Sequence, residues 1–151
     1  MAPEIQRKKI LIIDDELDMR IFLCNLLGKC GYEPIDSGEA AEGIQKAKKE
    51  KPDLIIIDMM MPREGGIQFY RQLKEEEDLK EVPVIMMSNL DERTFFLYQK
   101  FAGLSRRPGL PQPGAYMEKP LEAEELIKMI RSLTATNGCP MTGEDEEGQA
   151  F

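Results

Sequence analysis

Short, uninterrupted apolar runs recur along this chain and alternate with stretches of helical periodicity. The three strongest runs occupy residues 10–13, 54–57 and 82–87. Runs of this length are typical of strands that are buried on both faces, as in a parallel sheet. We therefore predict central strands at these three positions.

Two weaker segments predict further strands. Residues 32–36 contain Pro34, and because proline cannot donate a hydrogen bond to a neighbouring strand, this strand belongs at an edge of the sheet. Residues 115–118 form a short strand that is followed by Lys119 and Pro120. The chain is therefore expected to contain five strands.

Between these strands the apolar residues recur every three or four positions, which predicts helices. The first helix covers residues 17–30 and ends before Gly31, which stands where a helix cap is expected. Gly65 and Gly66 mark a tight loop before the third helix. The other helices are expected over residues 39–50, 91–101 and 122–133. The residues expected to face inward on the later helices are Ala40, Ile44, Ala47, Ile67, Tyr70, Leu73, Leu126, Ile127 and Ile130.

The chain thus repeats a strand and a helix five times. Right-handed crossovers place such units in a parallel sheet with helices on both faces. We predict a flavodoxin-like, doubly wound α/β fold with the strand order 2-1-3-4-5, which puts the strand of Pro34 at an edge. A length of 151 residues suits a single domain, expected over residues 8–133.

Polar residues follow the predicted strands at their carboxyl ends. Asp14 and Asp15 follow the first strand, Asp58 follows the third, and these strands are neighbours in the predicted order. Three carboxylates in one crevice repel one another unless a cation is present, and oxygen ligands of this kind favour Mg²⁺. Ser88 and Lys119, after the fourth and fifth strands, add a hydroxyl and an ammonium group to the same rim.

Composition excludes several classes of function. The 28 acidic and 20 basic residues give a net charge of -8, which argues against a nucleic-acid surface. The 3 cysteines have no metal-ligand spacing and there is no histidine, so neither a zinc site nor a disulfide framework is indicated. No segment is apolar enough to span a membrane or to act as a signal peptide. We expect a soluble, cytoplasmic protein with reduced thiols.

The order of these strand-end residues resembles the receiver domain of bacterial response regulators, of the single-domain, chemotaxis-regulator type. The resemblance implies that Asp58 is the phosphoacceptor and that Asp15 is the main Mg²⁺ ligand. It implies that Asp14 contributes to the metal site through water and that the backbone carbonyl of Met60 is a further ligand. Lys119 is then the residue that stabilises the transferring phosphoryl group.

The same resemblance implies a signalling switch. Ser88 is expected to hydrogen-bond the phosphoryl group, and Tyr116 to turn inward behind it. The phosphate is expected to come from a sensor histidine kinase or a histidine phosphotransfer protein, in a two-component system or phosphorelay. The output is expected to be contact with a protein target through the face of helix four, strand five and helix five, by a monomer or a phosphorylation-dependent dimer. The only reactions expected are the chain's own phosphotransfer and a slow autodephosphorylation.

Three features depart from the usual pattern of that family. Asn89 follows Ser88 where the family usually has a small residue, which could hinder the loop or the approach of a phosphodonor. Met60 and Leu90 are apolar at positions that influence the hydrolytic water, and they predict slow autodephosphorylation. The segment 103–114 is longer than usual and carries Arg106 and Arg107.

Several alternatives remain open at the level of sequence. The chain could be a pseudo-receiver, an interaction module that takes no phosphate. A phosphatase of the haloacid dehalogenase type also uses a strand-end Asp, but it needs a second Asp where this chain has Met60. The 103–114 segment could be a tolerated loop or a partner-recognition element. Residues 134–151 are expected to be a disordered acidic tail, either solvated or docked on Arg106 and Arg107, with no output domain.

Overall fold

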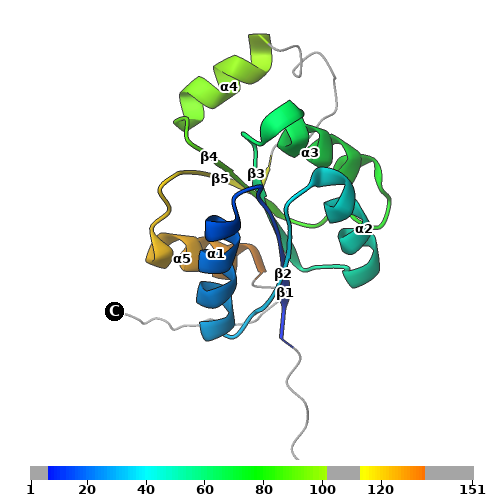
Figure 1. Cartoon of the computed structure of the whole chain (residues 1–151), viewed down its shortest axis with the longest axis vertical. Coiled ribbons are helices and arrows are strands. Elements are labelled where there is room, and N and C mark those ends of the chain that lie inside the picture. The colour runs from blue at the N-terminus through cyan, green and yellow to red at the C-terminus, as the bar shows by residue number, and fades with distance from the viewer. Residues whose placement is uncertain (1–6, 102–112, 135–151) are drawn as a thin grey trace, which may run out of the picture.

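Five parallel strands form one sheet in the order β2-β1-β3-β4-β5 (Figure 1). The structure is a computed structural model, and it describes residues 7–101 and 113–134. The strands are β1 (Lys9–Ile13), β2 (Glu33–Ser37), β3 (Leu54–Asp58), β4 (Val84–Ser88) and β5 (Ala115–Glu118). The predicted fold class and strand order are confirmed, and Pro34 lies in the edge strand β2, which pairs with β1.

The helices alternate with the strands as predicted. They are α1 (Leu17–Lys29), α2 (Ala40–Glu50), α3 (Gly65–Glu75), α4 (Glu92–Phe101) and α5 (Ala123–Thr134), with a short 3₁₀ helix η1 (Pro62–Glu64) before α3. Figure 1 shows α2 and α3 together on one side of the sheet and α1 and α5 on the other. Helix α1 ends before Gly31, whose positive φ of 93° is a conformation that glycine adopts without strain.

The sheet has a hydrophobic core on each face, because successive residues of a strand point to opposite sides. The strand residues that face α2, α3 and Phe95 of α4 are Leu11, Ile13, Ile55, Ile57, Val84 and Met86. Those that face α1 and α5 are Ile10, Ile12, Leu54, Ile56, Ile85 and Met87. All five residues of β3 are buried, as expected for the central strand of a sheet that is covered on both faces.

One detail differs from the sequence prediction, and a second, the orientation of α1, had been left open by it. Gly65 and Gly66 lie in the first turn of α3 rather than in a loop, and Gly66 lets this turn pack directly on the end of β3. Leu17 and Ile21 have helical spacing, but they lie on the outer side of α1 and are 59% and 50% exposed. Helix α1 carries apolar residues on its exposed side as well as on its buried side. The spacing of apolar residues alone therefore did not indicate which side faces the sheet.

Two of the predicted segments lie outside the described residues, namely most of the 103–114 insertion and the acidic tail after residue 134. Among the residues that the structure describes, no helix is both long and apolar enough to cross a membrane.

Candidate functional site

The carboxyl ends of β1 and β3 bring three acidic residues together. Ile13 pairs with Ile57 in the sheet, so the residues that follow these strands emerge at the same edge. Carboxylate oxygens of Asp14, Asp15 and Asp58 lie within 4.8 Å of one another. Asp14 and Asp58 are buried, at 0% and 4% exposure, while Asp15 is exposed.

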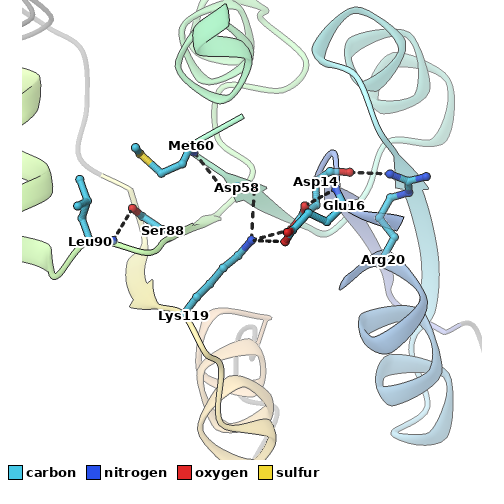
Figure 2. Close-up of polar contacts among 8 residues, drawn as sticks. All are labelled: Asp14, Glu16, Arg20, Asp58, Met60, Ser88, Leu90 and Lys119. Carbon is cyan, nitrogen blue, oxygen red and sulfur yellow. Dashed lines mark hydrogen bonds and ion pairs between the residues drawn. The ribbon is translucent and has the colours of Figure 1, made fainter. Parts of the chain in front are cut away.

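Lys119 brings a positive charge into this group from the end of β5 (Figure 2). Its Nζ lies 3.1 Å from Oδ2 of Asp14 and 3.3 Å from Oδ2 of Asp58. Its backbone N–H donates to the carbonyl of Ser88 at 2.7 Å, which ties the residue to the end of β4. The Lys119 side chain is only 7% exposed, so its ammonium group is positioned by the fold and compensates two buried carboxylates.

Backbone N–H groups hold the other oxygen of each buried carboxylate. The amide of Glu16 donates to Oδ1 of Asp14 at 2.8 Å, and the amide of Met60 donates to Oδ1 of Asp58 at 2.9 Å. Each carboxylate is therefore fixed between a backbone amide and the ammonium group of Lys119. Such hydrogen bonds set the direction in which the remaining lone pairs of the oxygens point.

Burial controls the electrostatics of the site. It raises the pKa of Asp14 from 3.8 to about 6, assisted by the nearby charge of Asp58 and opposed by the Glu16 amide and by Lys119. Burial also disfavours the charged form of Lys119, but the carboxylates of Asp58 and Asp14 outweigh this effect, so the pKa of Lys119 lies above its usual value. The site thus holds more negative charge than Lys119 alone compensates.

Ser88, the last residue of β4, and Tyr116 of β5 are linked through Leu90. The amide of Leu90 donates to Oγ of Ser88 at 3.0 Å, and the hydroxyl of Tyr116 donates to the carbonyl of Leu90 at 2.6 Å. The ring of Tyr116 packs on Phe95 of α4 with 5.1 Å between centroids. Burial raises the pKa of Tyr116, and the side chain of Ser88 partly offsets this effect. Tyr116 therefore points inward toward the β4–α4 loop.

The structure adds three residues for which the sequence suggested no role. Glu16 lies 3.5 Å from Lys119, although it is largely exposed. Arg20 donates to the backbone carbonyl of Asp14 at 2.8 Å. Gly66 packs against the backbone of Asp58. Glu16 directly follows Asp14 and Asp15 in the sequence, whereas Arg20 looks like an ordinary polar position of a helix and Gly66 like a loop residue.

Gly66 is expected to be intolerant of any side chain. A Cβ atom at this position would lie 2.3 Å from the carbonyl oxygen of Asp58 and 2.7 Å from Cα of Met59. Both are backbone atoms, so Gly66→Ala should lower the free energy of unfolding by about 1 to 3 kcal/mol. Gly28→Ala is the matched control, because nothing lies within 4 Å of an added Cβ there. It should raise stability by up to about 1 kcal/mol in the same denaturation assay; equal effects of the two changes would contradict this account.

The donor set suits a small, hard cation. Three carboxylates converge on one point, two of them are buried, and the single ammonium group of Lys119 contacts only Asp14 and Asp58 among them. Oxygen donors of this kind fit Mg²⁺, which binds through one or two carboxylates and retains several waters.

These features define the class of protein to which the chain belongs. Residues 10–131 match the response regulator receiver domain, and the chain is a member of this family. An acidic group such as Asp14, Asp15 and Asp58 is typical of the magnesium site of receiver domains. Receivers are signalling modules of two-component systems rather than conventional enzymes, and they interact with histidine kinases.

Individual relatives agree with this assignment. Alkaline phosphatase synthesis transcriptional regulatory protein PhoP of Bacillus subtilis is 34% identical over 149 residues, covering 94% of this chain and 57% of that protein. Protein PilH of Pseudomonas aeruginosa is 30% identical over 127 residues, covering 84% of this chain and 98% of that protein. The chemotaxis protein CheY4 of Vibrio cholerae has a similar fold, with a TM-score of 0.71 at 24% identity, over 85% of this chain and 99% of that chain.

The relatives differ in how much of their length the chain matches. It spans about half of PhoP and about half of the phosphate regulon transcriptional regulatory protein PhoB of Escherichia coli, at 57% and 51%. It spans nearly all of PilH, at 98%.

Proposed function

We propose that this chain is a phosphoacceptor response regulator that receives a phosphoryl group on Asp58 and signals through protein contacts. In this proposal residues 8–133 are the receiver domain, residues 134–151 are a tail, and the phosphodonor is a histidine kinase or a histidine phosphotransfer protein. The observation that carries the proposal is the placement of Lys119, whose ammonium group lies 3.3 Å from Asp58 and 3.1 Å from Asp14. A buried carboxylate with a fixed cation beside it is suited to accept an anionic group.

The proposed reaction is an in-line displacement at phosphorus. An oxygen of the Asp58 carboxylate forms a bond to phosphorus while the bond from phosphorus to the imidazole nitrogen of the donor histidine breaks. The electron pair of the broken bond stays on the imidazole. Lys119 stabilises the negative oxygens of the phosphoryl group, and the Met60 amide keeps the Asp58 carboxylate oriented at 2.9 Å.

Asp15, Asp14 and Asp58 would hold Mg²⁺, together with the backbone carbonyl of Met60. When bound, the ion would neutralise charge on the carboxylates and on the transferring phosphoryl group. The protein's contribution is to keep the carboxylates in place before the donor arrives, through the amide hydrogen bonds of Glu16 and Met60.

Ser88 and Tyr116 are the proposed switch. The Ser88 hydroxyl is bonded to the Leu90 amide at 3.0 Å, and the Tyr116 hydroxyl to the Leu90 carbonyl at 2.6 Å. If the Ser88 hydroxyl turns to a phosphoryl oxygen on Asp58, it releases the Leu90 amide. The loop that Tyr116 anchors then changes its contacts, which transmits the local charge change to α4 and β5.

The face of α4, β5 and α5 is the proposed contact surface for a protein target. A surface groove of about 620 Å³ lies on the part of this face that β5 and α5 form. Met117 and Met129 contribute apolar surface to it, and Glu118, Glu122 and Glu125 contribute acidic groups. Tyr116 also lines this groove, so the switch residue and the contact surface are continuous.

Mass spectrometry of the intact protein tests this function. After incubation with acetyl phosphate and MgCl₂, we expect the mass to increase by one phosphoryl group. The increase should be absent without MgCl₂ and absent in Asp58→Asn. No increase with acetyl phosphate, followed by no transfer from any phosphorylated histidine kinase or phosphotransfer domain, would favour the alternative of a pseudo-receiver.

Met60 and Leu90 are expected to slow the loss of the phosphoryl group. Met60 lies next to Asp58, to which its amide donates a hydrogen bond (Figure 2), and it is 41% exposed. We propose that its apolar side chain hinders the approach of a hydrolytic water. Replacing Met60 and Leu90 together with Gln should shorten the half-life of the phosphorylated protein by about 10-fold or more, because polar groups orient the attacking water. Leu97→Gln, at an exposed position of α4, is the control. An unchanged half-life in the double variant would refute this role.

A further inference from the structure

Arg20 reaches from the first turn of α1 to the carboxyl ends of β1 and β2 and forms one hydrogen bond at each. Its Nη1 donates to the backbone carbonyl of Asp14 at 2.8 Å, and its Nε donates to Oδ2 of Asp36 at 2.9 Å. The side chain is 19% exposed. Figure 2 shows Asp14 between Arg20 on one side and Lys119 on the other.

The carbonyl that Arg20 binds belongs to the peptide group that joins Asp14 to Asp15. A peptide group is planar, so fixing its carbonyl also fixes the direction in which the next residue leaves the chain. The amide of Asp14 is held as well, because it donates to the carbonyl of Ser37 at 3.1 Å. Both peptide groups around Asp14 are therefore anchored, one by β2 and one by Arg20.

Asp15 depends on this backbone anchor more than Asp14 or Asp58 does. Its side chain is exposed, and among the described residues it forms no hydrogen bond or ion pair that would hold it. Asp14 and Asp58, by contrast, are each bonded to a backbone amide and to Lys119. The orientation of Asp15 thus follows from the peptide group that precedes it.

We propose that Arg20 is a positioning residue for the metal site, which fixes the Asp14–Asp15 peptide group so that Asp15 faces the other two carboxylates. The inference rests on the proposed function, because it assigns Asp15 to a site for Mg²⁺. Arginine suits this task because its planar fork reaches two acceptors at once, the Asp14 carbonyl and the Asp36 carboxylate. A lysine at this position has one nitrogen and cannot hold both in the same geometry.

The neighbouring backbone leaves room for the guanidinium group. A Cβ atom on Gly38 would lie 2.8 Å from Nη1 of Arg20, so any side chain at position 38 would displace the nitrogen that binds Asp14. Gly38→Ala therefore disturbs the contact while it leaves Arg20 itself in the chain.

The two possible roles of Arg20, positioning the ligands or acting only through its positive charge, predict opposite changes in Mg²⁺ affinity when Arg20 is replaced. If Arg20 acted only through its positive charge, its removal would strengthen the binding of a cation. If Arg20 positions the ligands, its removal weakens binding, although the site becomes more negative. The direction of the change separates the two roles.

Amide NMR titrations with MgCl₂ on the full chain measure this direction. We expect Arg20→Gln to raise the Kd for Mg²⁺ about 10-fold. Arg20→Lys, which keeps the charge and loses the fork, and Gly38→Ala should also raise it, by smaller factors. Arg7→Gln is the matched control, because Arg7 also donates to two backbone carbonyls, those of Gly28 and Gly31, at the other end of α1.

The Kd of Arg7→Gln should equal that of the wild type. An Arg20→Gln variant that binds Mg²⁺ as tightly as the wild type or more tightly would overturn the inference. So would an equal loss in Arg7→Gln, which would indicate general destabilisation. If the wild type itself showed no saturable Mg²⁺ binding, the proposed metal site would fail first, and the inference with it.

Discussion

Replacing Lys119 with Met should lower the free energy of unfolding at pH 7 by about 3 kcal/mol, because it leaves two buried carboxylates without their cation. Lys119 is 7% exposed and contacts Asp14 and Asp58, which are themselves buried. The aliphatic part of the side chain is retained in Met, so the loss measures charge rather than packing. Chemical denaturation in the absence of Mg²⁺ is the appropriate measurement.

The loss of stability in Lys119→Met should be larger at high pH than at low pH. Lys119 lowers the pKa of Asp14, which burial raises to about 6, so the variant should hold an even higher pKa at Asp14. The loss of stability in Lys119→Met is then largest at a pH above the raised pKa of Asp14 in the variant. It shrinks as the pH falls through that pKa, since a protonated carboxyl group needs no cation. Phosphorylation by acetyl phosphate should fall at least about 100-fold, as expected on loss of a group that stabilises the transition state.

Lys9→Met provides the matched control for this prediction. Lys9 also lies 3.1 Å from a carboxylate, that of Glu50, but its side chain is 36% exposed. An exposed ion pair contributes at most about 1 kcal/mol. Equal losses of stability in Lys9→Met and Lys119→Met would mean that the acidic site does not depend on its buried cation.

Asp14→Asn should have the opposite effect on the protein without metal. A folded-state pKa of about 6 against 3.8 means that ionised Asp14 destabilises the folded state at neutral pH. Asn can still accept the hydrogen bond of the Glu16 amide, so the variant should be more stable by about 2 to 3 kcal/mol at pH 7. Because the folded-state pKa of Asp14 is raised, the extra stability of Asp14→Asn over the wild type should be complete above about pH 6. It should be absent below about pH 4, where Asp14 of the wild type is neutral in both the folded and the unfolded state.

Magnesium should reverse the order of stability of the wild type and Asp14→Asn. The wild type should gain stability with increasing MgCl₂, while Asp14→Asn should gain little, because binding to the folded state alone raises stability. Asp15→Asn separates charge burial from metal binding, since Asp15 is exposed and its replacement should change the stability of the metal-free protein much less. Thermal melts of the three proteins with and without MgCl₂ test both statements. A wild type more stable than Asp14→Asn in the absence of metal would contradict the burial argument.

The order of the strands and most of the acidic group could be predicted from sequence for one physical reason. Short, continuous apolar runs such as residues 54–57 indicate strands that are covered on both faces of a parallel sheet. Right-handed crossover connections then place the carboxyl ends of these strands at the same edge of the sheet. Asp14 and Lys119 are separated by 105 positions, yet both follow strands of one sheet, so their approach to 3.1 Å follows from the topology.

Contacts that depend on packing between elements could not be predicted in this way. Arg20 looks like any polar residue of a helix, and only the packing of α1 beside the end of β2 brings it to Asp36. Gly66 looks like a loop residue, and its role appears only when α3 is seated on the carbonyl of Asp58. Periodicity likewise did not reveal that Leu17 and Ile21 face away from the sheet, because α1 is apolar on several sides.

The identity of the residue that carries the phosphoryl group is the most direct test of the central claim. Borohydride reduces an aspartyl phosphate to homoserine, so the modified residue can be located by peptide mass spectrometry after treatment with acetyl phosphate and MgCl₂. The account predicts homoserine at position 58, dependent on MgCl₂. Homoserine at position 14 or 15, or a phosphoryl group that resists reduction because it sits on a hydroxyl, would contradict it.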